Sequence, residues 1–360
     1  MPKLMFCAST QNLRTARSSF SVSKSPKNPI WTKRLILRLS ATVYDPLGLI
    51  SPYTVKARSI LQDLWKVPNL GWDDQIPDKF SQRWSDWLTE LFLLADMISI
   101  PRFLQFKSFR KSQIHVFCDA SGKVYASSAY VRITEPTVVT AIGEIDPKVD
   151  VEKVVAVTLV TSKARVTPTK TESISRLELA ACVLAVRIGN GVAQAYGLNP
   201  KDVQYWTDST NCLYWITSPS SVMKVFVANR VGEVQNESDP NNWRHVPTEL
   251  NPADIPTRPP KVEDLKDNPQ WWTGPAFLMK PEVEWPAKFV PTPDDAAKEE
   301  LKREFTSYNI STRPKVKRCG KLNANHQSVG SRWDGYKNLI KNTKRSCQCP
   351  HNFTHRNSFL

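Results

Sequence analysis

Two apolar segments that each run into an aspartate decide the fold: QIHVFCDAS at residues 113–121 and VQYWTDST at residues 203–210. Both are dense in β-branched and aromatic residues, which favour strands on a half-buried pleated surface. We therefore expect five strands in one sheet, two of which end in an aspartate. Similar segments predict the other three strands, at 125–133, 154–166 and 242–247.

A helical pattern follows the third predicted strand. Between residues 173 and 196 apolar side chains recur every three or four positions, which predicts one long amphipathic helix with Gly197 as its C-cap. Shorter helices are predicted at 211–216 and 226–237. Three strands, a helix, a strand, further helices and a last strand predict an α/β domain with a mixed sheet, which we place at 109–260.

Four acidic residues lie at the starts or ends of these segments: Asp119, Glu178, Asp208 and Asp254. Neighbouring strands would place Asp119 and Asp208 at one rim of the sheet, and Glu178 in the first turn of the long helix can face that rim. Carboxylates that are brought together and buried are costly unless cations lie between them. Because Mg²⁺ prefers carboxylate oxygens, the four acids predict a two-Mg²⁺ site for phosphoryl transfer, in which Mn²⁺ can substitute.

Each acid also has a plain structural interpretation, which the sequence leaves open. Asp119 fits a turn, and Asp254 fits a loop between two prolines. Glu178 fits a capping box with Ser175, and Asp208 fits the N-cap of the short helix that follows it. These interpretations apply to one residue at a time, whereas the metal site accounts for the four acids together.

His245 lies nine residues before Asp254, in the segment WRHVPTELNPAD. A histidine in this position can protonate a leaving group or assist product release. It can equally be a strand-end histidine whose ring is satisfied by a backbone carbonyl. The sequence supports both interpretations.

The segments on either side of the α/β domain lack comparable chemistry. Residues 31–108 contain three helical patterns with apolar faces, which predict a small helical packing and binding unit. Residues 261–297 are rich in proline, and we expect their apolar WWTGPAFL segment to pack on the preceding domain. The chain contains no run of 18 apolar residues, so we expect no membrane-spanning segment.

Positive charge is concentrated at the two ends of the chain. The net charge is +15; residues 1–38 hold eight Lys and Arg and no acid, and residues 298–360 hold fourteen against four acids, which leaves −3 for the rest. We expect residues 1–30 to be a disordered basic leader and residues 298–360 to be a disordered basic tail. Basic ends suit contact with a polyanion such as nucleic acid, although solvated ends share the composition.

The seven cysteines are scattered without the spacing of a disulfide framework. This favours a reducing intracellular compartment, cytoplasmic or nuclear. The Arg- and Ser-rich start also has the composition of a mitochondrial transit peptide, which we regard as the less favoured interpretation. Four residues near the C-terminus are of types that bind zinc, but their spacing is not that of a zinc finger: Cys347, Cys349, His351 and His355.

The order of these segments and their local sequences resemble the ribonuclease H domain of retrotransposon polyproteins, the BEL/Pao family in particular. The resemblance extends over residues 31–280 and is carried by HVFCDAS, SKARVTP, SRLELAA, YWTDST, FVANRVGEVQ, WRHVPTELNPAD and WWTGPAFL. Upstream, TKRLILRLSATVYDPLGLISP and GWDDQIP resemble the region that links the family's reverse transcriptase to its ribonuclease H. Residues 31–108 are therefore expected to be such a connection.

The resemblance implies a ribonuclease H-like sheet of five strands with flanking helices. It also implies cleavage of the RNA strand of an RNA–DNA hybrid, with Asp119, Glu178, Asp208 and Asp254 in the positions of the family's four metal-binding acids. The expected partners are nucleic acid and other parts of a polyprotein, without a membrane. We expect nucleic-acid contacts from Ser121, Lys163, Arg165 and Ser209.

The chain also departs from the family pattern. No Tyr-x-Asp-Asp motif occurs and no protease or integrase core is visible, so we expect no polymerase activity. Ser175 stands where proline is common, and Pro256 follows Asp254 closely enough to shift the fourth ligand. The alternative function is therefore a catalytically silent nucleic-acid-binding remnant of a reverse transcriptase that lacks its polymerase palm.

Overall fold

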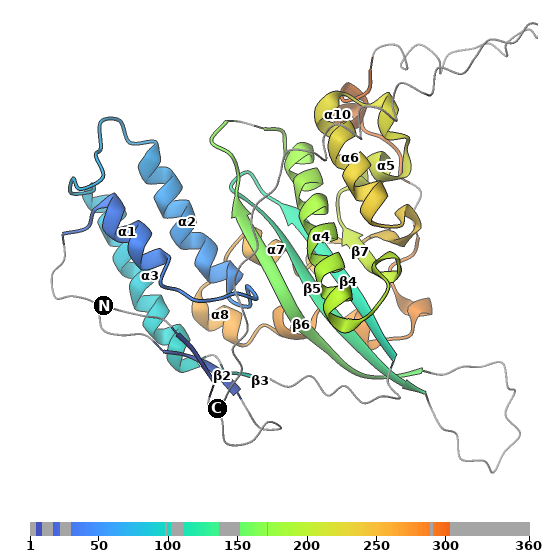
Figure 1. Ribbon diagram of the computed structural model, residues 1–360, viewed down its shortest axis with the longest axis horizontal. Helices are drawn as coiled ribbons and strands as arrows, with labels where there is room; N and C mark the ends of the chain where they lie inside the picture. Colours follow the sequence, from blue (N-terminus) through green and yellow to red (C-terminus); the bar gives the residue numbers. More distant parts are fainter. Residues whose placement is uncertain are drawn as a thin grey trace, which may run out of the picture. The chain divides into compact units, whose positions relative to one another are not determined.

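The computed structural model describes residues 5–8, 17–21, 30–97, 99–101, 111–136, 152–170, 172–288 and 291–302 (Figure 1). All of them fall in the first of two units of the chain, Met1–Asn309. The second unit, Ile310–Leu360, lies outside the described residues, and so do most of the predicted basic tail and its four residues of zinc-binding type.

A mixed five-stranded sheet is the centre of the described chain (Figure 1). The first three strands pair antiparallel, and the last two are added in parallel. All five predicted strands are present, so the α/β class with a mixed sheet is confirmed. In the order β6-β5-β4-β7-β8, the strands are β4 (Lys111–Ala120), β5 (Val124–Pro136), β6 (Glu152–Val166), β7 (Gln204–Thr207) and β8 (Trp243–His245).

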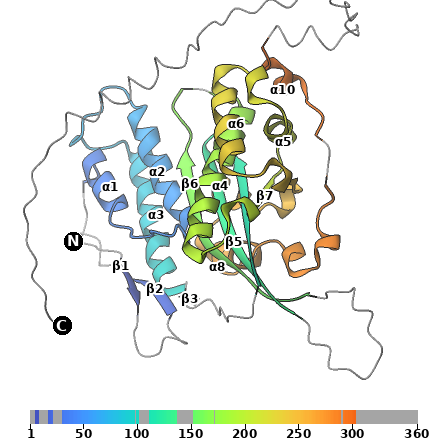
Figure 2. The same cartoon turned by 45° about the vertical axis from the view of Figure 1, so that its right-hand side comes forward.

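Three helices cover one face of this sheet (Figure 2). α4 (Ile174–Tyr196) packs on β4 and β5, and α5 (Thr210–Thr217) and α6 (Val225–Glu237) pack on α4. Among the described helices, α4 is the one that is long and apolar enough to cross a membrane by length and composition. Most of its apolar surface is buried against the sheet, which is the pattern of a core helix.

The ends of α4 differ in how well the sequence predicted them. Ser173 is the N-cap, and its side chain accepts a hydrogen bond from the backbone N–H of Arg176 at 3.4 Å. The capping box between Ser175 and Glu178 is therefore not formed. Gly197 ends the helix with a φ of 67°, a left-handed conformation that glycine adopts without steric cost, as predicted.

The segment after β8 covers the opposite face of the sheet. Trp271, Phe277 and Trp285 from this segment join one apolar cluster with residues of β4 and β7. The segment therefore packs on the α/β domain, as we expected for WWTGPAFL. Its helices are α7 (Asp254–Thr257), α8 (Val262–Lys266) and α9 (Pro269–Thr273), whereas the later α10 (Asp295–Glu299) contacts α5 on the helical face. The 3-10 turns of the domain are η1 (Pro200–Asp202), η2 (Ser220–Val222), η3 (Pro240–Asn242), η4 (Thr248–Leu250), η5 (Ala276–Met279) and η6 (Glu282–Glu284).

The predicted helical unit consists of α1 (Lys33–Ser40), α2 (Ser51–Trp65) and α3 (Asp78–Met97). It has its own apolar core, in which Trp87 stacks on Tyr53 and on Trp84 at ring distances of 5.1 and 4.7 Å. Aromatic rings supply a large buried area, so a unit of three helices can hold a stable core. Val55, Ile60 and Leu64 are buried as the helical pattern predicted, and Leu61 is half-buried.

The helical unit also caps the free edge of the sheet at β6. The backbone N–H of Ser162 donates to the carbonyl of Leu47 at 2.8 Å, and Arg58 of α2 donates to the carbonyl of Ala164 at 3.0 Å. Gly48 has a φ of 68°, and a Cβ there would lie 1.8 Å from the carbonyl oxygen of Ser162. These contacts occupy backbone groups that an uncovered edge strand would offer to another chain.

A second, three-stranded sheet joins β1 (Met5–Ala8), β2 (Arg17–Ser21) and β3 (Ser99–Pro101). β1 and β2 lie in the leader, where composition led us to expect no regular structure. β1 pairs with β2, and β2 pairs in turn with β3, which lies far along the chain. At the other end, Leu301 forms a β-bridge with Met223, so the described fold extends four residues past the predicted start of the tail.

Candidate active site

β4, β7 and β8 end side by side. Cys118 pairs with Thr207 in parallel register, so the next residue of each strand, Asp119 or Asp208, lies at the same edge of the sheet. His245, the last residue of β8, pairs with Thr207 as well. The carboxyl ends of three parallel strands therefore bring together three of the predicted site residues.

Glu178 reaches this edge from the second turn of α4. The hydroxyl of Ser209 donates a hydrogen bond to Glu178 Oε2 at 2.5 Å. Ser209 is also the N-cap of α5, where its Oγ accepts from the backbone N–H of Cys212 at 3.2 Å. Ser209 therefore takes the capping role that was one interpretation of Asp208, and it links Glu178 to the end of β7.

Asp119 is almost fully buried, with 6% of its surface exposed. Thr257 donates from Oγ1 to Asp119 Oδ2 at 2.5 Å. Burial raises the pKa of Asp119 to about 7; the Thr257 hydrogen bond lowers it, and the nearby charges of Asp208 and Asp254 raise it. Burial and the neighbouring acids therefore disfavour the ionised form of Asp119.

The ionised form of Glu178 is disfavoured in the same way. Burial raises the pKa of Glu178, the Ser209 hydrogen bond lowers it, and the charges of Asp208 and Asp294 raise it. Asp208 thus interacts with both Glu178 and Asp119, and the acids form a connected chain of like charges. A bound cation would relieve this repulsion.

Asp254 is the first residue of α7 and Thr257 is the last, so one short helix carries both the fourth acid and the hydroxyl partner of Asp119. Pro256 lies within this single turn, where its missing N–H removes no intrahelical bond. Asp254 remains close enough to raise the pKa of Asp119. Its Oδ1 lies 3.3 Å from Arg258 Nε, but this buried oxygen has no hydrogen bond.

The four acids suit a hard divalent cation in their chemistry, because all of their donor atoms are carboxylate oxygens. Asp254 Oδ1 is also a buried oxygen that lacks a hydrogen bond. Across the described ranges, however, no group of three His, Cys, Asp or Glu side chains is arranged to hold a metal ion. Three of the four carboxylates each accept a hydrogen bond from a neighbouring hydroxyl.

The predicted nucleic-acid-binding residues fall into two kinds. The hydroxyls of Ser121 and Ser209 already have partners in the protein; Ser121 donates to the carbonyl of Thr257 at 3.1 Å. Lys163 and Arg165 are exposed on β6 and flank Ala164. Because Ala126 pairs with both Asp119 and Ala164, these two cations lie two strands away from the acids.

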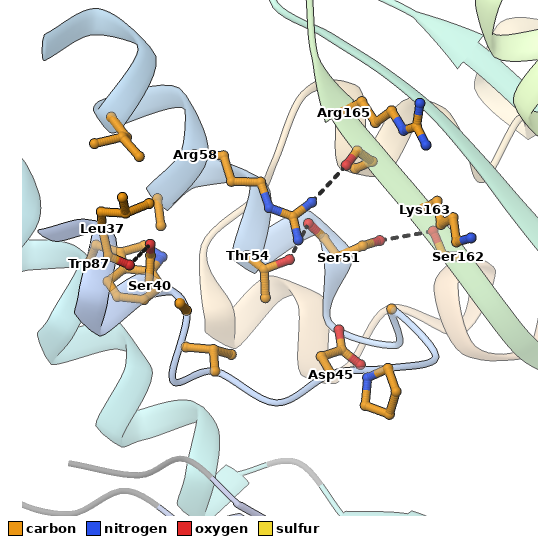
Figure 3. Close-up of a pocket in the computed structure, with 17 residues that line it drawn as sticks. Leu37, Ser40, Asp45, Ser51, Thr54, Arg58, Trp87, Ser162, Lys163 and Arg165 are labelled. Atoms are coloured by element: carbon orange, nitrogen blue, oxygen red, sulfur yellow. Dashed lines mark hydrogen bonds between the residues drawn. The ribbon is translucent and has the colours of Figure 1, made fainter. Parts of the chain in front are cut away.

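A cavity of about 540 Å³ lies apart from the acids, and none of them lines it. It lies where the helical unit meets β6, and Figure 3 shows Arg58, Lys163 and Arg165 around it. Its one acid, Asp45, accepts hydrogen bonds from the backbone N–H groups of Leu49 and Ile50 at 2.9 and 3.0 Å. This cavity is therefore a cationic pocket whose only carboxylate is already satisfied by backbone groups.

Several residues that hold the acids were not predicted. Thr248 donates from Oγ1 to Asp208 Oδ2 at 2.8 Å, and Asn251 donates to Asp208 Oδ1 at 3.4 Å. Asp294, which raises the pKa of Glu178, accepts from Asn211 at 2.9 Å. Thr248, Asn251 and Thr257 all lie within the segment that contains Asp254, and their side-chain hydrogen-bonding groups were the available signal.

One family model matches the chain. Residues 32–209 match the Pao retrotransposon-like RNaseH-like domain. The match spans the helical unit and reaches Ser209, so it includes Asp119, Glu178 and Asp208, while His245 and Asp254 lie beyond it. No curated protein matches the chain.

Proposed function

Because residues 32–209 place this chain in the Pao retrotransposon-like RNaseH-like family, we propose that it hydrolyses the RNA strand of RNA–DNA hybrids. The observation that carries the proposal is the pairing of Cys118 with Thr207, which sets Asp119 and Asp208 side by side at the ends of adjacent strands. Burial raises the pKa of Asp119 and the nearby charge of Asp208 adds to the rise, which supports a role for a cation at this edge.

In this proposal the four acids Asp119, Glu178, Asp208 and Asp254 hold two Mg²⁺ ions, or Mn²⁺ in their place. When bound, the two ions activate a water and stabilise the leaving oxygen of a phosphodiester that is cleaved in line. The protein itself would hold the carboxylates at one edge of the sheet and exclude bulk water from Asp119, which is buried.

His245 is the group that we assign to proton transfer. It ends β8 in register with Thr207 and is half-buried. An imidazole at this edge is suited to protonate the leaving 3′ oxygen, because histidine is the side chain that most often acts as a general acid. This role requires His245 to face the scissile phosphate when substrate is bound.

Lys163 and Arg165 are the groups that we assign to the second strand of the hybrid. They lie two strands from Asp119, a separation of about 10 Å at the usual strand spacing. Exposed cations at this separation are suited to phosphates across a groove from the scissile bond. Ser121 and Ser209 shape the site through their internal hydrogen bonds, and other parts of a polyprotein are further candidate partners.

A catalytically silent nucleic-acid-binding module is the second candidate. It is favoured by the hydroxyl partners of Asp119, Glu178 and Asp208, which satisfy these acids without a cation. It is also favoured by the absence, from the described part of the chain, of any ready-made metal-binding group. The two candidates share the fold and differ in turnover.

Incubation of the full chain with an RNA–DNA hybrid discriminates between them. The two strands carry different labels, and Mg²⁺ is supplied or removed with a chelator. We expect Mg²⁺-dependent cleavage of the RNA strand, loss of cleavage in Asp119→Asn, and retention in Asp267→Asn, an exposed aspartate of the same domain. Hybrid binding with no cleavage by any of the three proteins would support the silent module.

A further inference from the structure

The turn between β8 and α7 forms hydrogen bonds to Asp208 and to the residues before Asp119 and Asp254. Thr248 begins η4, and Asn251 is the C-cap of the same turn. Both side chains donate to Asp208, at 2.8 Å to Oδ2 and at 3.4 Å to Oδ1. The two oxygens of one carboxylate are thus held by two residues of a single turn.

Asn251 extends these contacts to the residues that directly precede Asp119 and Asp254. Its side chain is buried, and its Nδ2 also donates to the carbonyl oxygen of Cys118, the residue before Asp119, at 3.0 Å. Its Oδ1 accepts from the backbone N–H of Ala253, the residue before Asp254, at 3.1 Å. One amide therefore joins the end of β4, the carboxylate of Asp208 and the start of α7.

The chemistry of these partners fixes the orientation of the Asn251 amide. Carbonyl and carboxylate oxygens require a donor, whereas a backbone N–H requires an acceptor, so Nδ2 and Oδ1 cannot exchange places. A side chain that lacks either group cannot make the three contacts. Burial makes the loss of such contacts costly, because no water replaces them.

We propose that Thr248 and Asn251 are positioning residues that hold Asp208 in register with Asp119 and Asp254 for joint binding of a divalent cation. This inference rests on the proposed function. The two residues act through hydrogen bonds to the acids and to their neighbours in the chain. Partners of this kind, one shell beyond the metal-binding groups, typically change metal affinity or activity by about 10- to 100-fold.

Calorimetric titration of Mg²⁺ into the metal-free full chain, without nucleic acid, tests the proposal. Asn251→Ala is expected to weaken Mg²⁺ binding by about 10- to 100-fold at a temperature where circular dichroism shows it folded. Asn242→Ala is the matched control, because Asn242 also donates to a backbone carbonyl, at 2.7 Å, in the same domain. Equal affinities of wild type and Asn251→Ala would overturn the proposal.

Thr248→Val keeps the test decisive if Asn251→Ala does not fold. Thr248 is exposed, and valine has nearly the same shape, so this variant removes the hydroxyl with little effect on folding. We expect a several-fold loss of Mg²⁺ affinity and a matching fall in kcat for hybrid cleavage, with KM unchanged. Unchanged affinity in Thr248→Val would contradict a positioning role.

The titration also separates this inference from the proposed function. If wild type neither binds Mg²⁺ nor cleaves a hybrid, the proposed function fails, and the inference fails with it. If wild type binds and cleaves while the Thr248 and Asn251 variants do the same, the inference alone fails.

Discussion

Asp45 and Asp119 are both largely buried aspartates with raised pKa values, yet their surroundings differ. Burial raises the pKa of Asp45 to about 6, and backbone N–H groups at the start of α2 and the charge of Arg58 lower it (Figure 3). Burial raises the pKa of Asp119 to about 7, and two further acids add to the increase. Asp45 therefore belongs to a satisfied loop, whereas Asp119 belongs to a group of like charges.

The difference shows that burial of a carboxylate does not by itself indicate a catalytic site. Asp45 has the role of a remote cap, because Ile50, the N-cap of α2, has no side-chain hydrogen bond of its own. Asp119 has one hydroxyl donor and acidic neighbours, an arrangement that a cation would complete.

Replacement of each aspartate by asparagine should affect catalysis to very different extents. Asp119→Asn should reduce RNA cleavage by about 10⁴-fold, the scale seen when one member of a catalytic group is removed. Asp45→Asn should leave kcat within a few-fold of wild type, because Asp45 lies in a separate pocket. Equal losses in the two variants, measured with a labelled hybrid, would remove the distinction.

The two aspartates should also produce different pH dependences of stability in the metal-free protein. Both folded pKa values are raised, so each group contributes stability that is present below about pH 4 and is lost as the pH rises through its folded pKa. For Asp119 the loss is on the order of 4 kcal/mol by pH 7, from a rise from 3.8 to about 7.

Chemical unfolding at several pH values measures this loss. Asp45→Asn should remove one share of the loss between about pH 4 and 6, whereas Asp119→Asn should remove a share between about pH 4 and 7, including most of the loss above pH 6. Saturating Mg²⁺ should reduce the loss in wild type and leave Asp119→Asn little changed. A pH profile that is identical in all three proteins would contradict the assigned surroundings of Asp119.

Removal of the Asp45 side chain should have a smaller effect, confined to folding. Asp45→Ala leaves the N–H groups of Leu49 and Ile50 without their acceptor, at a cost of about 1–3 kcal/mol. Thermal unfolding should show the decrease, and Asp73→Ala is a suitable control, because Asp73 is exposed and pairs with Arg34. An equal decrease in the two variants would argue against the capping role.

The smallest expected effect concerns the cations on β6. Double replacement of Lys163 and Arg165 by alanine should reduce the slope of log binding constant against log salt by about two for a hybrid. Lys266→Ala, at an exposed site on α8, should leave the slope unchanged. An unchanged slope in the double variant would exclude phosphate contacts by these residues.

The sequence was informative where local pattern determines structure. The β-branched runs before Asp119 and Asp208 predicted β4 and β7, and apolar spacing together with Gly197 predicted α4 within one residue of its ends. The strand order and the parallel register of Cys118 with Thr207 depend on pairing between distant segments.

The partners of the acids depended on the same distant pairing. Ser173, and not Ser175, is the N-cap of α4, and Glu178 accepts a hydrogen bond from Ser209, which belongs to another segment. Thr257 and Asn251 meet β4 only in the folded chain, so their spacing in the sequence carried no sign of that contact.

Titration of Mg²⁺ into the chelator-treated full chain, with labelled RNA–DNA hybrid present, asks whether the acids at the edge of the sheet form a metal-dependent nuclease site. RNA cleavage is expected to rise from background to saturation with Mg²⁺ in wild type and to stay at background in Asp119→Asn. Cleavage that is absent from wild type at every Mg²⁺ and Mn²⁺ concentration, with the hybrid still bound, would contradict the claim that these acids form a nuclease site.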